Sequence, residues 1–343
     1  MSRLVSTLRG ALLLAVALFV TPAAAAEIFS FAMWGDMPYA RNGDVPKIPN
    51  LLDHMNRSDI AFSIFNGDFK DGSSRCDDAA YADAMRMFNG LRAPAVYVPG
   101  DNEWTDCHRT NNGGFDNLER LAYLRKTMFA TNQTFGQTKM TVEQQGRPGE
   151  KFSENTRFVH QGIVFAQLNV PGSNNNKVLS DAECTNASAR TLALCAANNA
   201  EYEERDRSNI EWLKAAFAMA RTQNAPGIVL TIQADLWFDL VETATINERD
   251  APTASGYNAF VDALVAETRA YRGQVLLLHG DTHFFKVDKP LLNQLEMVPN
   301  LTRVEGFGSP NVHWVRIGVD PATADVFHVR QMLVPANVVV TAR

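Results

Sequence analysis

Three short apolar segments of this chain each run into a glycine followed by an aspartate. The segments 27–34, 60–65 and 95–98 end at Gly35-Asp36, Gly67-Asp68 and Gly100-Asp101. An apolar run that stops at a glycine is typical of a buried strand. Amphipathic stretches lie between these segments, and strands that alternate with helices predict an α/β fold.

The rest of the chain continues this alternation. We expect helices over 77–91, 208–223 and 257–271, strands over 228–232 and 274–278, and two strands each within 158–170 and 312–333. The helix 208–223 is expected to begin at Ser208, because Glu211 would complete a capping box with it. The polar stretches 136–155 and 173–199 predict loop-rich insertions, which either shape a substrate pocket or are ordinary surface loops.

The N-terminal segment 1–26 has the features of a secretory signal peptide. It carries two arginines, an apolar run over 11–20 and four alanines ahead of Glu27. The apolar run is too short to span a bilayer comfortably, which disfavours an uncleaved anchor. We therefore expect a secreted or periplasmic protein with no membrane span after cleavage, in which residues 27–343 form one domain.

The charge of the mature chain limits its partners. Removal of two arginines from 32 basic residues leaves 30 against 38 acidic residues, a net charge of −8. Such a chain is a poor match for a nucleic acid polymer or an anionic membrane surface. A small phosphorylated substrate is still compatible, because bound metal ions reset the local field. The sequence gives no oligomeric state.

Four cysteines, Cys76, Cys107, Cys184 and Cys195, allow three pairings. Cys184 and Cys195 flank a short polar loop, so we predict that they are bonded and that Cys76 pairs with Cys107. No CxxC spacing occurs, which disfavours a metal site. Reduced buried thiols are the alternative, disfavoured by an oxidising compartment.

Five predicted strands end in residues that bind metals or hydrogen-bond to ligands. Asp36, Asp68 and Asp101 follow the first three, Gln233 follows the strand 228–232, and Asp281 and His283 follow the strand 274–278. Ligands of α/β sheets bind at the carboxyl ends of strands. Acids gathered there repel each other unless cations lie between them, so the set predicts one or two metals bound mainly through oxygen.

The order of these motifs resembles that of the calcineurin-like metallophosphoesterases, which include the purple acid phosphatases. The family carries D-x-H, G-D-x-x-D/Y, G-N-H-D/E, a lone histidine after a strand, and G-H-x-H. In their places stand Asp36-Met37-Pro38, Gly67-Asp68-Phe69-Lys70-Asp71, Gly100-Asp101-Asn102-Glu103, Gln233 and Gly280-Asp281-Thr282-His283. The resemblance implies two mixed β-sheets packed as a sandwich, flanked by helices, with the site at one edge.

The resemblance also implies a ligand set and an activity. Asp36, Asp68 and His283 would hold one metal, and Asp68, Asp101, Gln233 and Asp281 the other, with Asp68 as the bridge. The implied activity is hydrolysis of a phosphomonoester or phosphodiester by a metal-activated water. The chain departs from the family at Pro38, Asp101, Asn102, Gln233 and Asp281.

The substitutions change the charge of the expected site. Four carboxylates, from Asp36, Asp68, Asp101 and Asp281, stand where the family has two. Two divalent cations, or one trivalent and one divalent cation, would therefore be largely neutralised by their ligands. We expect Mn²⁺, Mg²⁺, Ca²⁺ or iron to be favoured over Zn²⁺ at the second site.

The catalytic candidates follow from the same motifs. Asn102 occupies the place of the family's catalytic histidine, and its amide can bind phosphate but cannot carry a proton. His279 is the leading candidate for a general acid. The alternatives are that it replaces a missing metal ligand or that it only hydrogen-bonds a metal ligand. His108, Arg109 and Arg75 either meet the substrate or are ordinary surface charges.

Other residues follow the motif acids closely. Tyr39 and Asp71 are candidates for the surroundings of the metals, with a turn-capping role as the alternative for Asp71, and Glu103 is expected to buttress its motif.

Two further functions compete with phosphoester hydrolysis. The first is a metal- or ligand-binding protein that keeps the fold and has lost turnover, as Pro38, Asn102 and Gln233 suggest. The second is hydrolysis of a non-phosphate bond by the same metal-activated water, which predicts activity on esters or amides.

Overall fold

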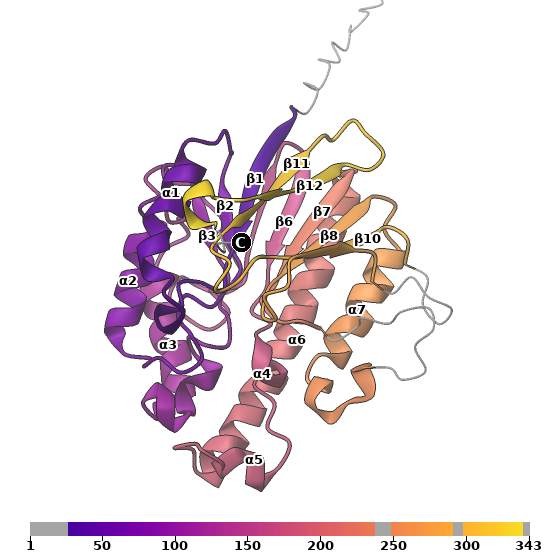
Figure 1. Ribbon diagram of the computed structural model, residues 1–343. Helices are drawn as coiled ribbons and strands as arrows, with labels where there is room; N and C mark the ends of the chain where they lie inside the picture. The colour runs from indigo at the N-terminus through magenta and orange to yellow at the C-terminus, as the bar shows by residue number, and fades with distance from the viewer. Residues whose placement is uncertain (1–26, 237–247, 291–297, 339–343) are drawn as a thin grey trace, which may run out of the picture.

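The computed structural model describes residues 27–236, 248–290 and 298–338 (Figure 1). The predicted signal peptide lies outside the described residues. No helix in the described part is both long and apolar enough to cross a bilayer. Both predicted disulfide bonds are confirmed, Cys76–Cys107 and Cys184–Cys195.

Two mixed β-sheets form the centre of the fold. The first has the order β12-β11-β1-β2-β3. The strands β1, β2 and β3 are parallel to one another, and β11 is antiparallel to both of its neighbours, β1 and β12. Its strands are β1 (Phe29–Trp34), β2 (Ser63–Phe65), β3 (Ala95–Tyr97), β11 (Trp314–Val319) and β12 (Phe327–Met332).

The second sheet has the order β4-β5-β6-β7-β8-β10-β9, with β6, β7, β8 and β10 parallel. Its strands are β4 (Glu143–Gln144), β5 (Thr156–His160), β6 (Ile163–Gln167), β7 (Gly227–Thr231), β8 (Gln274–His279), β9 (Lys286–Asp288) and β10 (Leu301–Glu305). The predicted fold class is confirmed, because both sheets are mixed and helices cover their outer faces.

Strand alternation explains the layers. Phe31 and Ile64 of the first sheet pack against Phe165 and Leu276 of the second, in the core between the sheets. The opposite faces pack against helices, as Figure 1 shows. The central strands β1, β2, β3, β6, β7 and β8 therefore bury both faces, which explains why their sequences are largely apolar.

The helices lie in two groups (Figure 1). The helices α1 (Ile48–Asn56), α2 (Asp78–Phe88) and α3 (Asn117–Met128) contribute to the core outside the first sheet. The helices α6 (Leu192–Thr222) and α7 (Asn258–Arg269) contribute to the core outside the second sheet. Two short elements, α4 (Gly172–Asn175) and α5 (Asp181–Thr185), lie between β6 and α6 along the chain.

The prediction for α6 is wrong at its start. Ser208 is not an N-cap but a buried residue inside the helix, which begins after Thr191, whose side chain accepts a hydrogen bond from the Leu194 N–H. Part of the predicted loop 173–199 is therefore helical. The first half of α6 lacks an apolar stripe because its buried face carries Asn198, Arg205 and Asp206, so hydrophobic periodicity cannot reveal it.

Candidate metal centre

The ends of strands from both sheets bring acids together. The chain leaves β2 into Asp68, leaves β3 into Asp101 and leaves β8 into Asp281. One ligand oxygen from each of these three acids lies within 4.8 Å of the other two. The acids predicted from separate strands therefore do converge at one edge of the sandwich.

Left-handed backbone turns aim these side chains. Asp36, Asp68, Asp281 and His283 have φ angles of 52°, 62°, 80° and 68°. This conformation costs a residue other than glycine roughly 1–2 kcal/mol. Such strain, repeated after β1, β2 and β8, is typical of functional sites.

Asp68 accepts the most hydrogen bonds of the cluster. Its Oδ2 accepts from Tyr39 Oη at 3.1 Å and from Asn102 Nδ2 at 2.6 Å, and its Oδ1 accepts from the Asn102 N–H at 3.1 Å. Glu103 holds the loop from behind by accepting from the backbone N–H groups of Asp68 and Gly100. Asn102 and Tyr39 thus border Asp68, and Glu103 buttresses its motif.

Asp36 and His283 face each other at one side of the cluster. His283 Nε2 lies 3.7 Å from Asp36 Oδ1. His283 Nδ1 lies 2.8 Å from the Ser309 carbonyl oxygen, so this nitrogen donates and Nε2 keeps its lone pair. Asp36 Oδ2 is buried and has no hydrogen-bond partner among the described residues. Asp36 Oδ2 and His283 Nε2 are thus available as ligand atoms on this side of the cluster.

Gln233 lies in the cluster but points its nitrogen at the acids. Its Oε1 accepts from the Gly172 N–H at 2.6 Å, while Nε2 donates to Asp68 Oδ2 at 3.3 Å and to Asp281 Oδ1 at 3.2 Å. Because the backbone N–H fixes the amide orientation, Gln233 connects two acids as a donor. This arrangement does not support its predicted role as a ligand.

His279 lies apart from the cleft. It ends β8 on the same side as Leu277, and its buried ring lies near Asp235, Glu305 and Arg303. Burial lowers its pKa. The strand does not stay extended as far as Asp281, where φ is 80°, so the predicted shared face of His279, Asp281 and His283 does not form.

Burial and mutual repulsion govern the charge of the centre. Burial, and then the neighbouring carboxylates, raise the pKa values of Asp36, Asp68 and Asp281 well above the usual value. Without cations the site therefore holds protons that the same acids would lose in water.

A cleft of about 780 Å³ opens beside the cluster. Asp281 lines it, together with Asp106, Arg109 and other residues of the segments 105–111, 173–178 and 183–190. The predicted insertion 173–199 therefore does shape a pocket, whereas 136–155 contributes no lining residue. Of the predicted cations, His108 and Arg109 line the cleft and Arg75 does not.

The turn Ser173–Asn176 also belongs to the site, although the sequence analysis did not predict this. Its four residues have φ between 50° and 64°. Ser173 Oγ lies 2.7 Å from both Asp101 Oδ2 and Asp106 Oδ1, so it joins the cluster to the cleft. The run of asparagines was the available signal, because asparagine tolerates this conformation.

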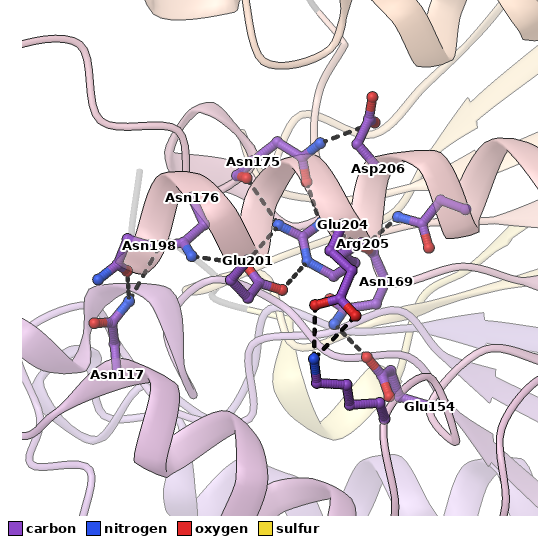
Figure 2. A network of polar contacts seen from close by, with 12 residues as sticks. Asn117, Glu154, Asn169, Asn175, Asn176, Asn198, Glu201, Glu204, Arg205 and Asp206 are labelled. Atoms are coloured by element: carbon purple, nitrogen blue, oxygen red, sulfur yellow. Dashed lines mark hydrogen bonds and ion pairs between the residues drawn. The ribbon is translucent and has the colours of Figure 1, made fainter. Parts of the chain in front are cut away.

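A buried polar network on α6 supports this turn (Figure 2). Arg205 donates from Nη2 to the Asn175 carbonyl oxygen at 2.8 Å and from Nη1 to the Asn169 carbonyl oxygen at 3.0 Å. Glu201 accepts from Arg205 Nε at 2.7 Å and from Asn176 Nδ2 at 2.8 Å. The first half of α6 therefore holds the turn against the cluster.

Comparisons with known proteins give matches of fold only. No protein-family profile matches the chain, and no curated protein sequence does. One similar structure is GAP50, the anchor in the inner membrane complex of Plasmodium, with 13% identity, a TM-score of 0.45 and 89% of each chain covered.

Two phosphoesterases are also similar in fold. A purple acid phosphatase from yellow lupin (Lupinus luteus) seeds has 10% identity and a TM-score of 0.47, with 93% of this chain and 57% of that chain covered. A 5'-nucleotidase from Candida albicans has 10% identity and a TM-score of 0.42, with 88% and 50% covered. The chain thus spans about half the length of these two proteins.

Proposed function

We propose that this chain is an exported, metal-dependent hydrolase that cleaves a phosphomonoester or phosphodiester of a small molecule. The observation that carries the proposal is the convergence of Asp68, Asp101 and Asp281, whose ligand oxygens lie within 4.8 Å of one another beside a cleft. Uncompensated acids this close and this buried are costly, and divalent cations are their usual partners.

The proposed centre has two cation places. Asp36, Asp68 and His283 would hold one, because Asp36 Oδ2 has no hydrogen-bond partner among the described residues and His283 Nε2 keeps its lone pair. Asp68, Asp101 and Asp281 would hold the other. Gly172 keeps that place open, since a Cβ there would lie 2.7 Å from Asp281 Oδ1.

The oxygen-rich set suits Mn²⁺, Mg²⁺, Ca²⁺ or iron better than Zn²⁺ at the second place. Such cations would supply a Lewis acid for the phosphoryl group and would lower the pKa of water.

The other residues position and enclose the substrate. Gln233 fixes Asp68 and Asp281 relative to each other, and Asn102 fixes Asp68 further by donating its amide to Asp68 Oδ2 and Tyr39 Oη. The cleft is large enough for a leaving group of drug-like size. Its lining side chains Arg109 and Lys177 supply positive charge for an anionic substrate.

The proposed export rests on two features. Residues 1–26 are expected to be a signal peptide, and both disulfide bonds are of the kind that persists outside the cytoplasm.

Reconstitution with metals tests the proposal. Protein stripped with EDTA is expected to hydrolyse aryl phosphate mono- or diesters only after addition of Mn²⁺, Mg²⁺, Ca²⁺ or iron. Asp68→Asn should lower kcat/KM by more than about a hundredfold, because the shared ligand is lost. Asp53→Asn, an exposed acid of α1, is the control and should leave the rate unchanged. Equal rates in EDTA and in metal would contradict the proposal.

A metal- or ligand-binding protein without turnover is the second candidate. It is favoured by the Gln233 amide nitrogen, which donates to two of the acids, and by Asn102, which cannot carry a proton. Stoichiometric metal uptake by folded protein, with no turnover of any aryl phosphate, would establish it in place of the enzyme.

A further inference from the structure

Two of the three permanent cations that line the cleft make no ion pair with its carboxylates in the described part of the chain. Arg109, Arg190 and Lys177 line it together with His108. Arg109 is already paired, because its Nη1 lies 2.6 Å from Asp106 Oδ2. The remaining cations are therefore the ones available to a ligand.

Arg190 is the most unusual of them. It is only 8% exposed, and it makes no ion pair with a carboxylate in the described part of the chain. Its Nε donates to the Cys184 carbonyl oxygen at 3.2 Å and its Nη2 to the Glu183 carbonyl oxygen at 3.4 Å. These neutral acceptors orient the guanidinium, while the carboxylates of Glu183 and Asp106 act on its charge from a distance, without an ion pair. An anion in direct contact with the guanidinium would add charge-assisted hydrogen bonds that these carboxylates do not make.

His108 adds a second unused group at the same place. Its Nδ1 is buried and has no hydrogen-bond partner among the residues that the structure describes. Burial, together with the charges of Arg190 and Arg109, lowers the pKa of His108 to about 3. The ring is therefore neutral at pH 7 and can donate one hydrogen bond without adding charge.

The two groups stand on a rigid wall. The backbone around His108 pairs with the segment before Arg190: the Ala189 N–H donates to the His108 carbonyl oxygen at 2.9 Å, and the Thr110 N–H donates to the Ala187 carbonyl oxygen at 3.0 Å. Disulfide bonds fix both segments, since Cys107 precedes His108 and Cys184 accepts from Arg190. A fixed wall is suited to recognition, because little side-chain entropy is lost on binding.

We propose that Arg190 and His108 bind a second anionic group of the substrate, away from the metal centre in the same cleft. This inference rests on the proposed function and narrows it. The substrate is a phosphoester whose leaving group carries its own phosphate or carboxylate. The scissile phosphate lies at the Asp281 side of the cleft, and the second anion lies against Arg190.

Binding of inorganic phosphate to EDTA-treated protein tests the site without any turnover. The acid cluster repels phosphate when no cation is present, so calorimetry reports the cationic wall. Arg190→Met should weaken phosphate binding by roughly tenfold or more, since a charge-assisted contact is lost. Arg190→Lys keeps the positive charge and should weaken phosphate binding less than Arg190→Met does.

Arg157→Met is the matched control. Arg157 is also 8% exposed but pairs with Glu143, and it does not line the cleft. It should leave phosphate binding unchanged. If Arg190→Met does not fold, Lys177→Met provides the second test, because Lys177 also lines the cleft, and a smaller loss of phosphate binding is expected.

Turnover identifies the source of the second anion. Bisphosphates of linear alkanediols and ω-carboxyalkyl phosphates, each with two to six carbons, are compared with the matching hydroxyalkyl monophosphates. At least one bis-anionic chain length should have a kcat/KM about tenfold or more higher, and Arg190→Met should abolish that advantage. The preferred series shows whether the anion is phosphate or carboxylate.

The outcomes separate this inference from the proposed function. Phosphate binding that depends on Arg190, without turnover by any metal-loaded form, supports the site and refutes the enzyme. Metal-dependent turnover with no preference for bis-anionic esters, or phosphate binding that Arg190→Met leaves unchanged, overturns the anion site and leaves the enzyme standing.

Discussion

Replacement of Asp101 by asparagine should stabilise the protein when metal has been removed. Asp101 is the first carboxylate whose charge raises the pKa values of Asp68 and Asp281, after burial itself. Its Oδ2 accepts one hydrogen bond, from Ser173 Oγ at 2.7 Å. An asparagine oxygen can still accept that bond, and the amide nitrogen can donate to a neighbouring acid.

The magnitude follows from the geometry. Ligand oxygens of Asp68, Asp101 and Asp281 lie within 4.8 Å of one another. At that separation two charges repel by about 3.5 kcal/mol at an effective dielectric constant of about 20. The repulsion cannot exceed about 4 kcal/mol, because that is the free energy needed to keep an ordinary aspartate protonated at pH 7, and a more strongly repelled acid would take up a proton instead. After a loss of about 1 kcal/mol in hydrogen bonding, we expect a net gain of about 1–3 kcal/mol in the free energy of unfolding.

The raised pKa values also determine whether stability rises or falls with pH. Asp68 and Asp281 have raised pKa values when folded, so the folded state binds more protons than the unfolded state above about pH 4, the ordinary pKa of an aspartate. Stability of the metal-free wild type therefore falls as pH rises from that value toward neutrality. Asp101→Asn lowers both folded pKa values and makes the fall shallower.

Urea unfolding followed by circular dichroism in EDTA, at pH 4 and pH 7, measures the effect. The gain should be present at pH 7 and nearly absent at pH 4, and Mn²⁺ should stabilise the variant less than the wild type because a ligand is lost. Asp53→Asn is the control. Parallel stability curves for the variant and the wild type between pH 4 and pH 7 would refute the reasoning.

Three further substitutions test other parts of the account. Gly172→Ala would place a Cβ 2.8 Å from Asp101 Oδ2, so Mn²⁺ affinity by calorimetry should fall more than about tenfold; unchanged affinity would place the metal elsewhere. Arg205→Met removes the support of the Ser173–Asn176 turn and leaves Glu201 without its ion-pair partner, so urea unfolding should show a loss of about 3–5 kcal/mol; a loss below about 1 kcal/mol would contradict the role of the α6 network. Replacing Cys76 and Cys107 by serine opens a loop with a sequence separation of 31 and should cost about 3–4 kcal/mol; full stability in the double variant would show that the bond constrains little.

The strands that carry the metal centre could be predicted because their signals are local. Each is an apolar run cut off by glycine and an acid, and β1, β2 and β3 lie within the predicted ranges. Such a pattern depends on burial of both faces of a sheet, which a single sequence records directly. The strand β9 was missed because it has three residues, and β10 was missed because its sequence LTRVE is mostly polar.

The supporting parts of the site depend on tertiary contacts and were missed. Arg205 is fully buried in the first half of α6, where polar side chains take the place of an apolar stripe. The left-handed turn at Ser173 is held by hydrogen bonds to Asp101 and to distant residues. The position of His279 followed from a change of backbone direction at Asp281, which strand parity does not contain.

The central claim is that acids from separate strands gather to hold shared cations. Anomalous scattering from crystals grown with Mn²⁺ tests it most directly. The account predicts manganese within about 2.5 Å of carboxylate oxygens of Asp68, Asp101 and Asp281, with a second ion between Asp68, Asp36 and His283. Saturating Mn²⁺ with no anomalous peak at these side chains, which instead stay hydrogen-bonded to one another as neutral acids, would contradict it.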